Sequence, residues 1–391
     1  MKKTKWQALL GAAFLMATSA IGPGFLTQTA VFTAQLGASF GFIILTSIVL
    51  DIIVQLNIWR VIVVAGLPAQ QIANKLVGGL GYFIASLVFL GGLAFNIGNI
   101  GGAGLGLTAL LNIDTKYGAA LSAVVALAIF AYKEATKAMD LFTKILGLLM
   151  IVLMLYVALT SNPPLREVAV NAIIPAKFDF NALLTIVGGT VGGYITFAGA
   201  HRLLDANISG TDELKAVNKG AASAIGIASL MRTLLFLAAI GVVSKGLMLD
   251  QSNPPASVFK LAGGEFGYRL FGLVMWSAAI TSVIGSAYTS ISFIKSFHPK
   301  IDRFHNLFVI IFILTSGAIF LAVGQPVKTL IIAGALNGLI LPISLSLMLI
   351  AAYKTRIVGE YKQPTWLTAA GVVVIIFMSW IGYKTIWLLL N

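Results

Sequence analysis

Two glycine-rich segments, each in the middle of a long apolar run, have the clearest chemical potential. The first is Gly22-Pro23-Gly24-Phe25, and the second extends from Gly188 through Gly192 and Gly193 to Tyr194. Proline lacks an N–H and clashes with the preceding turn, and glycines make unwinding easier, so both segments are predicted to break a helix. A broken helix presents unpaired N–H groups to anions and free carbonyls to cations. These segments therefore form the predicted substrate-binding site, although such glycines also occur where helices only pack closely.

Polar and aromatic residues near the two segments extend this predicted site. Gln28 follows the first segment by about one helical turn, and Asn96 and Asn99 share one face of a later apolar run. Buried amides in lipid need partners, so the two asparagines either line a cavity or hold helices together. The rings of Phe25 and Tyr194 either close over a substrate as an aromatic lid or make ordinary packing contacts. We assign Gln28 and Asn96 to substrate binding and Asn99 to coupling or gating.

Asp51 is a carboxylate well inside a predicted helix, about midway along it. A charge in the middle of a bilayer costs several kcal/mol unless it is paired or protonated, so this residue is a functional candidate. It suits a role in coupling protons to transport. The alternatives are a structural pair with Lys144 or Arg232, or a position near the inner surface.

Three basic residues are further candidates for coupling or gating. Arg232 lies inside a predicted helix, where it contacts a carboxylate substrate, pairs with an acid or extends to the interface. His201 and Arg202 lie near the end of the helix that contains the second glycine segment. They form either a proton relay or inner gate, or a simple interfacial pair in which the arginine is a topological signal.

The composition decides what kind of elements must position these residues. Apolar residues make up 59% of the 391 residues and charged residues only 10%, with a mean hydropathy of +0.97. Soluble domains have about 25% charged residues, so the composition predicts an all-α polytopic membrane protein. The net charge of +13 comes from lysines and arginines between apolar runs, which predicts no nucleic-acid partner. Because the chain has no cysteine, it has no disulfides, thiolate metal sites or cysteine nucleophile.

Eleven membrane-spanning helices are predicted, within a single transmembrane domain that covers residues 1–391. They extend over residues 7–36, 40–59, 80–111, 117–132, 140–159, 181–204, 220–243, 266–292, 305–323, 328–352 and 366–389. The first apolar run is too long for a signal peptide and is expected to be retained. Lysines and arginines are about twice as frequent in segments on the side of the N-terminus. This bias predicts a plasma-membrane protein, of bacterial type, with a cytoplasmic N-terminus and an external C-terminus.

The two predicted breaks fall in the first and sixth helices, five helices apart. This pattern is typical of transporters built from an inverted repeat with a substrate site at the midplane. The first repeat would cover about residues 7–159 and the second about residues 181–352, with the helix at 366–389 outside both. The chain lacks a phosphate-binding loop motif, so we predict a secondary active transporter without an ATP site or other cofactor.

Several short motifs give the chain a resemblance to a known family. They are Gly37-Ala38-Ser39-Phe40-Gly41-Phe42, the Gly189-Thr190-Val191 entry into the second break, and the segment from Asn337 to Leu341-Pro342. With the two breaks and the helix count, the chain resembles the natural resistance-associated macrophage protein (Nramp) family of metal transporters. The resemblance implies the fold of the leucine-transporter type, in which hydroxyl groups of the eighth helix often help to form an ion site. Thr281 and Ser282 are the candidates for such a site here.

The metal chemistry of that family does not transfer to this chain. The family's first break reads Asp-Pro-Gly-Asn, whereas Gly22 and Phe25 replace its two polar ligands here. Its sixth-helix Met-Pro-His falls on Gly192, Gly193 and Tyr194, and its acidic pair in the third helix falls on Asn96 and Asn99. Dications need oxygen or nitrogen donors, usually with a carboxylate. We therefore expect no metal ligands at this site.

Three functions are weighed on these grounds. The leading hypothesis is proton- or ion-coupled transport of a small organic carboxylate, such as an amino acid or 5-oxoproline, because exposed amides without an acidic neighbour favour an anion. The first alternative is uptake of a divalent metal such as manganese, iron or magnesium, as the family resemblance implies. The second is a non-transporting membrane sensor or partner. Enzymatic catalysis is not predicted, since no histidine and acid accompany the hydroxyl groups, and the oligomeric state is left open.

Overall fold

The computed structural model describes residues 21–390, except for the side chains of residues 133–144, Ser296 and Leu389. This part of the chain consists of α-helices and short 3₁₀ turns, without a β-strand, as the composition predicts. The α-helices are α2 (Pro23–Leu36), α3 (Phe40–Ala65), α4 (Ala69–Leu76), α5 (Leu80–Leu111), α6 (Thr115–Ala131), α7 (Lys133–Thr160), α8 (Leu165–Ile173), α9 (Phe180–Thr190), α10 (Gly193–Asp205), α11 (Leu214–Val243), α12 (Pro254–Ile294), α13 (Pro299–Arg303), α14 (His305–Val323), α15 (Pro326–Ala351), α16 (Thr355–Val358) and α17 (Thr365–Leu390). The 3₁₀ turns are η1 (Gly37–Ser39), η2 (Thr211–Glu213) and η3 (Lys295–Phe297).

The length and composition of these helices confirm a polytopic membrane protein. Within residues 21–390, eight helical stretches are long and apolar enough to cross a membrane. A ninth is present if Ile145–Thr160 and Leu165–Ile173, which are bent by 108°, form one span. The count of eleven stays a prediction, because about half of the expected first helix lies outside the described residues and α6 is shorter than the other spans.

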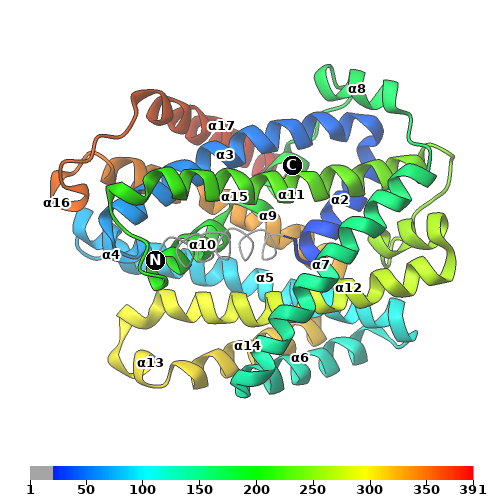
Figure 1. Ribbon diagram of the computed structural model, residues 1–391, viewed down its shortest axis with the longest axis horizontal. Helices are drawn as coiled ribbons and strands as arrows, with labels where there is room; N and C mark the ends of the chain where they lie inside the picture. The colour runs from blue at the N-terminus through cyan, green and yellow to red at the C-terminus, as the bar shows by residue number, and fades with distance from the viewer. Residues whose placement is uncertain (1–20, 391) are drawn as a thin grey trace.

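Helices α3, α5, α11 and α12 lie roughly along the longest axis of the molecule, whereas α7 crosses the molecule obliquely (Figure 1). The most extensive contact between two elements joins α5 to α12, and further large contacts join α15 to α9 and α5, and α11 to α3. Close packing of α5 depends on its glycines. A methyl group at Gly102 would lie only 2.1 Å from the Cβ of Pro23, and one at Gly106 would lie 2.7 Å from the backbone N of Trp276. The α5 glycines thus make room for the start of α2 and for α12.

The sixth predicted helix is broken at Gly192 and Gly193, where its glycine-rich segment predicts a break. Helix α9 ends at Thr190, and α10 begins at Gly193, with Gly192 in an extended conformation between them. Gly193 has a φ of +42°, which an L-residue with a Cβ rarely adopts. At the other glycine segment, Gly22 is also extended and α2 begins at Pro23, a residue well suited to the first helical turn. The half of the first helix that precedes residue 21 lies outside the described residues.

Helix α12 consists of two parts that meet at Gly264, a residue with a φ of +63°. The part after Gly264 agrees with the predicted span over residues 266–292. The part before it begins at Pro254, and the adjacent prolines Pro254 and Pro255 favour the first turn of a helix, because their fixed φ is helical and their missing N–H is not needed there. The connection between the predicted spans that end at 243 and begin at 266 thus contains a short helix.

Candidate functional site

Arg232 connects the two helix breaks. This residue of α11 is only 2% exposed, and its guanidinium carbon lies 4.2 Å from the centre of the Phe25 ring, next to the first break. Its Nη1 donates a hydrogen bond of 3.0 Å to the hydroxyl of Thr190, the last residue before the second break. Its Nε and Nη2 have no hydrogen-bond partner among residues 21–390. A buried cation with spare N–H groups therefore touches both broken helices.

Asp51 on α3 joins the same cluster. Its carboxyl group is 1% exposed and interacts with the charge of Arg232 and with the hydroxyl of Thr190. Its Oδ1 has no hydrogen-bond partner in the described part of the chain. Of the two predicted counter-ions, Arg232 belongs to the same cluster as Asp51, because both interact with Thr190, whereas the side chain of Lys144 lies outside the described residues. Three helices, α3, α9 and α11, thus contribute one group each to the cluster.

The first break faces polar groups of α5 and α12. A Cβ placed on Gly22 would lie 3.0 Å from Oγ of Ser282 and 3.5 Å from Oδ1 of Asn99. The Ser282 hydroxyl is buried and has no partner among the described residues. A side chain at Gly22 would therefore have to displace Ser282, so the carboxylate that the family carries at this point would not fit here without a shift.

The second break is held by a residue that the sequence analysis did not select as functional. Asn337 on α15 accepts a hydrogen bond of 3.3 Å from the backbone N–H of Tyr194, at the start of α10. Its Nδ2 donates to the backbone carbonyls of Gly91 and Ala333, at 3.0 and 2.9 Å. One N–H that the sequence predicted to be free for an anion is thus already occupied by Asn337. The signal for this role was its place in the motif that ends at Pro342, which we used only for the resemblance.

Gln28 and Asn96 are both buried and only partly satisfied. Nε2 of Gln28 donates to the carbonyl of Leu330 at 2.9 Å, and its Oε1 has no partner in the described part of the chain. Nδ2 of Asn96 donates to the carbonyl of Val283 at 2.7 Å and to the hydroxyl of Ser286 at 2.8 Å, whereas its Oδ1 is likewise unpaired there. Asn96 therefore both ties α5 to α12 and retains an acceptor that a ligand could use.

The remaining predicted site residues are placed around this centre. The Tyr194 ring packs edge-on against the ring of Phe95 at 5.4 Å. Thr281 is bonded within its own helix, to the carbonyls of Ser277 and Ala278 at 3.2 and 3.0 Å. Of the two residues predicted for an ion site, only Ser282 therefore lies beside the first break.

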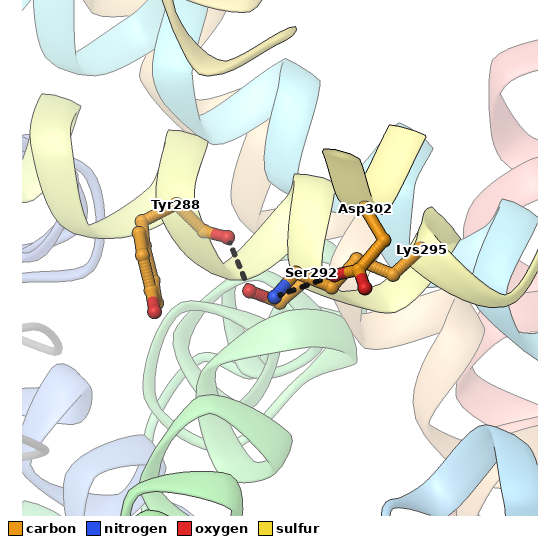
Figure 2. Close-up of polar contacts among 4 residues, drawn as sticks. All are labelled: Tyr288, Ser292, Lys295 and Asp302. Atoms are coloured by element: carbon orange, nitrogen blue, oxygen red, sulfur yellow. Dashed lines mark hydrogen bonds and ion pairs between the residues drawn. The ribbon is translucent and has the colours of Figure 1, made fainter. Parts of the chain in front are cut away.

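His201 and Arg202 lie at the far end of α10, beside a cavity of about 520 Å³. Nε2 of His201 accepts a hydrogen bond of 3.2 Å from the backbone N–H of Ala69, and its ring stacks on Phe293 at 4.5 Å. Figure 2 shows four residues of the opposite wall, in which Lys295 forms an ion pair of 3.4 Å with Asp302 and Ser292 donates to the carbonyl of Tyr288. Both predicted gating residues thus line a cavity at the end of the broken helix.

A second cavity, of about 870 Å³, lies at the opposite end of the same broken helix. It includes Asn181 and Leu184 of α9, and Val31 and Gln35 near the end of α2. The two cavities therefore lie at opposite ends of the α9–α10 pair, with the break between them.

Comparisons with known proteins agree with this geometry. A family profile described as natural resistance-associated macrophage protein-like matches residues 13–388. The chain belongs to the Nramp family. It is 59% identical over 385 residues to the uncharacterised membrane protein YcsG of Bacillus subtilis, which covers 98% of this chain and 95% of that relative. An uncharacterised membrane protein of Haemophilus influenzae is 54% identical over 379 residues, or 97% of this chain and 96% of that relative.

Solved structures show the fold of this Nramp protein. A manganese transporter of Eremococcus coleocola superposes with a TM-score of 0.75 at 16% identity, over 97% of this chain and 86% of that one. MhsT, solved in complex with L-phenylalanine, superposes with a TM-score of 0.65 at 16% identity, over 97% of this chain and 98% of that one. The expected leucine-transporter type of fold is thereby confirmed in outline. Because Nramp proteins are transporters and not enzymes, membership supports a role in membrane transport.

Proposed function

We propose that this Nramp protein is a secondary active transporter, coupled to protons or another ion, whose substrate is a small organic carboxylate such as an amino acid or 5-oxoproline. The observation that carries the proposal is Arg232, which touches both helix breaks and whose Nε and Nη2 have no hydrogen-bond partner among the described residues. Buried N–H donors without an acceptor are strongly unfavourable, so such a residue calls for a ligand with acceptor atoms, and a cation favours an anionic one.

A carboxylate fits the guanidinium of Arg232 better than other small ligands do. The planar guanidinium can donate two parallel hydrogen bonds to the two oxygens of a carboxylate. Such a ligand would sit where Phe25 and Thr190 meet the same guanidinium, and it would therefore contact both broken helices at once. A ligand that touches both breaks can favour one arrangement of the two helices over another, which is what transport requires.

The same arginine disfavours a divalent metal. At a separation of about 5 Å and an effective dielectric constant of about 20, a dication and a guanidinium repel each other by about 7 kcal/mol. Asp51 offsets part of this repulsion, but no group of three or more histidine, cysteine, aspartate or glutamate side chains that could hold a metal is found in the described residues. Metal uptake remains the alternative function, because a neighbour in fold is named as a manganese transporter. A non-transporting sensor is the second alternative.

The proposal includes the finer architecture. We assign eleven helices in a single transmembrane domain, with an inverted repeat over about residues 7–159 and 181–352 and an added helix near the C-terminus, in a plasma membrane with the N-terminus cytoplasmic and the C-terminus outside. Its support is the break between α9 and α10 and the start of α2 directly after the extended Gly22. Gly24, Gln28, Asn96 and Tyr194 belong to the proposed substrate site, and His201 and Arg202 to its inner gate.

Uptake into proteoliposomes tests the function. We expect a radiolabelled carboxylate from a panel that includes 5-oxoproline to accumulate in response to an inward proton gradient. Arg232→Gln should reduce this uptake at least about tenfold, the size expected for one charge-assisted hydrogen bond. Arg269→Gln, at an exposed position of α12, is the matched control and should transport normally. Manganese uptake that is the same in wild type and Arg232→Gln would contradict the proposal, and the absence of any uptake would favour the sensor.

A further inference from the structure

Asp51 and Arg232 are two buried side chains of opposite formal charge that belong to one cluster. Both side chains are at most 2% exposed, and both interact with the hydroxyl of Thr190. The charge of each acts on the other. The net charge of the cluster is zero when both residues are ionised.

We propose that Asp51 is the residue that takes up the coupling proton, because an incoming carboxylate replaces it as the partner of Arg232. This inference rests on the proposed function and assigns its coupling ion. In the empty site, the carboxylate of Asp51 balances the guanidinium. When the substrate carboxylate pairs with the guanidinium, a hydronium ion of the aqueous phase gives one proton to Asp51. One O–H bond of the hydronium ion breaks and one O–H bond forms on the carboxyl group of Asp51, which leaves a water molecule.

The charge balance of the buried cluster is the reason for this exchange. If both carboxylates stayed ionised beside one guanidinium, the buried cluster would carry a net charge of −1, which is strongly unfavourable in the interior of a membrane protein. Protonation of Asp51 restores a net charge of zero while the substrate stays ionised. The unpaired Oδ1 of Asp51 and the unpaired Nε and Nη2 of Arg232, all within the described residues, show that neither group has its full set of partners before a ligand arrives.

Asp51 is the acidic group of the described residues that shares the cluster with Arg232. Helix α3 packs against α2, α4, α8, α9, α10, α11, α15, α16, α17 and the turns η1 and η2, and the charge that acts on Asp51 from these elements is that of Arg232. His201 on α10 is bonded to the N–H of Ala69 and stacked on Phe293, so it belongs to the inner cavity. We therefore expect the proton to bind to Asp51 and the substrate to bind to Arg232, within the same cluster.

Thr190 links this exchange to the broken helix. Its hydroxyl lies 2.9 Å from the carbonyl of Ile186 and receives a hydrogen bond from Arg232. It is also the last residue of α9, directly before the break. A change in the charge of Asp51 therefore acts at the point where α9 ends. Protonation of Asp51 can in this way alter the arrangement of α9 and α10.

The test is calorimetric titration of the purified full-length protein with the carboxylates of the uptake panel, 5-oxoproline among them, in two buffers of different ionisation enthalpy. Wild type should take up about one proton per carboxylate bound, and its affinity should fall by up to about tenfold per pH unit as the pH rises. Asp51→Asn should bind the carboxylate with an affinity that no longer depends on pH and without proton uptake, and it should exchange substrate across vesicles without accumulating it. Asp212→Asn, at an exposed position, should behave as wild type.

The outcomes separate the two proposals. Unchanged proton uptake in Asp51→Asn, or carboxylate binding by wild type without proton uptake, would overturn the role of Asp51 and leave the proposed function intact. Absence of carboxylate binding in wild type would overturn the proposed function itself. If Asp51→Asn fails to fold, Asp51→Glu supplies the test, because it should restore proton uptake with a shifted pH dependence, whereas a purely structural role would leave the pH profile unmoved.

Discussion

At the second break the backbone is held by a neighbouring side chain, whereas the first break faces polar groups that have no partner in the described residues. Asn337 uses all of its amide in three hydrogen bonds, one of them to Tyr194 at the start of α10. Around the first break, the hydroxyls of Thr27 and Ser282 are buried and unpaired within residues 21–390. The comparison shows that the first break still has polar groups available to a ligand, whereas the backbone at the second break is fixed in place by Asn337.

The largest effect is expected from Gly193→Ala. The alanine Cβ would lie 1.8 Å from Oδ1 of Asn337, and the φ of +42° is unfavourable for any residue with a Cβ. We expect a loss of about 3 kcal/mol in stability, from backbone strain together with displacement of Asn337, and a large loss of transport. Thermal unfolding in detergent, followed by tryptophan fluorescence, measures the change. An unchanged melting temperature would show that Asn337 does not hold the backbone of the second break in place.

Asn337→Ala is expected to have the next largest effect. It leaves the carbonyl of Gly91 and the N–H of Tyr194 without their side-chain partner, which costs about 2 kcal/mol for buried groups. Combined with Gly193→Ala, it should destabilise less than the sum of the two single changes, because the overlap between the two positions disappears. Additive effects in this double-mutant cycle, measured by the same unfolding assay, would mean that the two residues do not act together.

A smaller effect is expected from Gly22→Ala at the first break. Its Cβ would lie 3.0 Å from Oγ of Ser282, and a shift of this hydroxyl is expected to cost about 1 kcal/mol. The free energy of carboxylate binding should change more than the free energy of unfolding does, because the unpaired Ser282 hydroxyl next to Gly22 is available to a ligand. Gly226→Ala, on α11 and outside the proposed site, is the matched control, since its Cβ would meet no atom within 4 Å. Equal carboxylate affinity in Gly22→Ala and in its control would contradict the contrast between the two breaks. Ser282→Ala in the Gly22→Ala background should restore carboxylate binding, because it removes the hydroxyl that the new Cβ displaces.

The sequence predicted the elements better than it predicted the contacts between them. The span at 80–111 coincides with α5, and the break at Gly192-Gly193 lies between α9 and α10, because glycine and apolar runs act locally. The cluster of Asp51, Thr190 and Arg232 could not be predicted in the same way. Its members lie on three helices far apart in the chain, and periodicity indicates which face of a helix is buried but not which residue it meets. Asn337 was missed for the same reason.

The central claim is that the buried arginine makes this Nramp protein a carboxylate transporter. Isothermal calorimetry on the purified protein, titrated with manganese, with magnesium and with a panel of small carboxylates, tests it most directly. We predict saturable heat from one carboxylate that is lost in Arg232→Gln, and no saturable heat from either metal. Micromolar metal binding that survives both Arg232→Gln and Asp51→Asn would contradict the claim, because it would show that backbone and neutral side chains alone form a cation site.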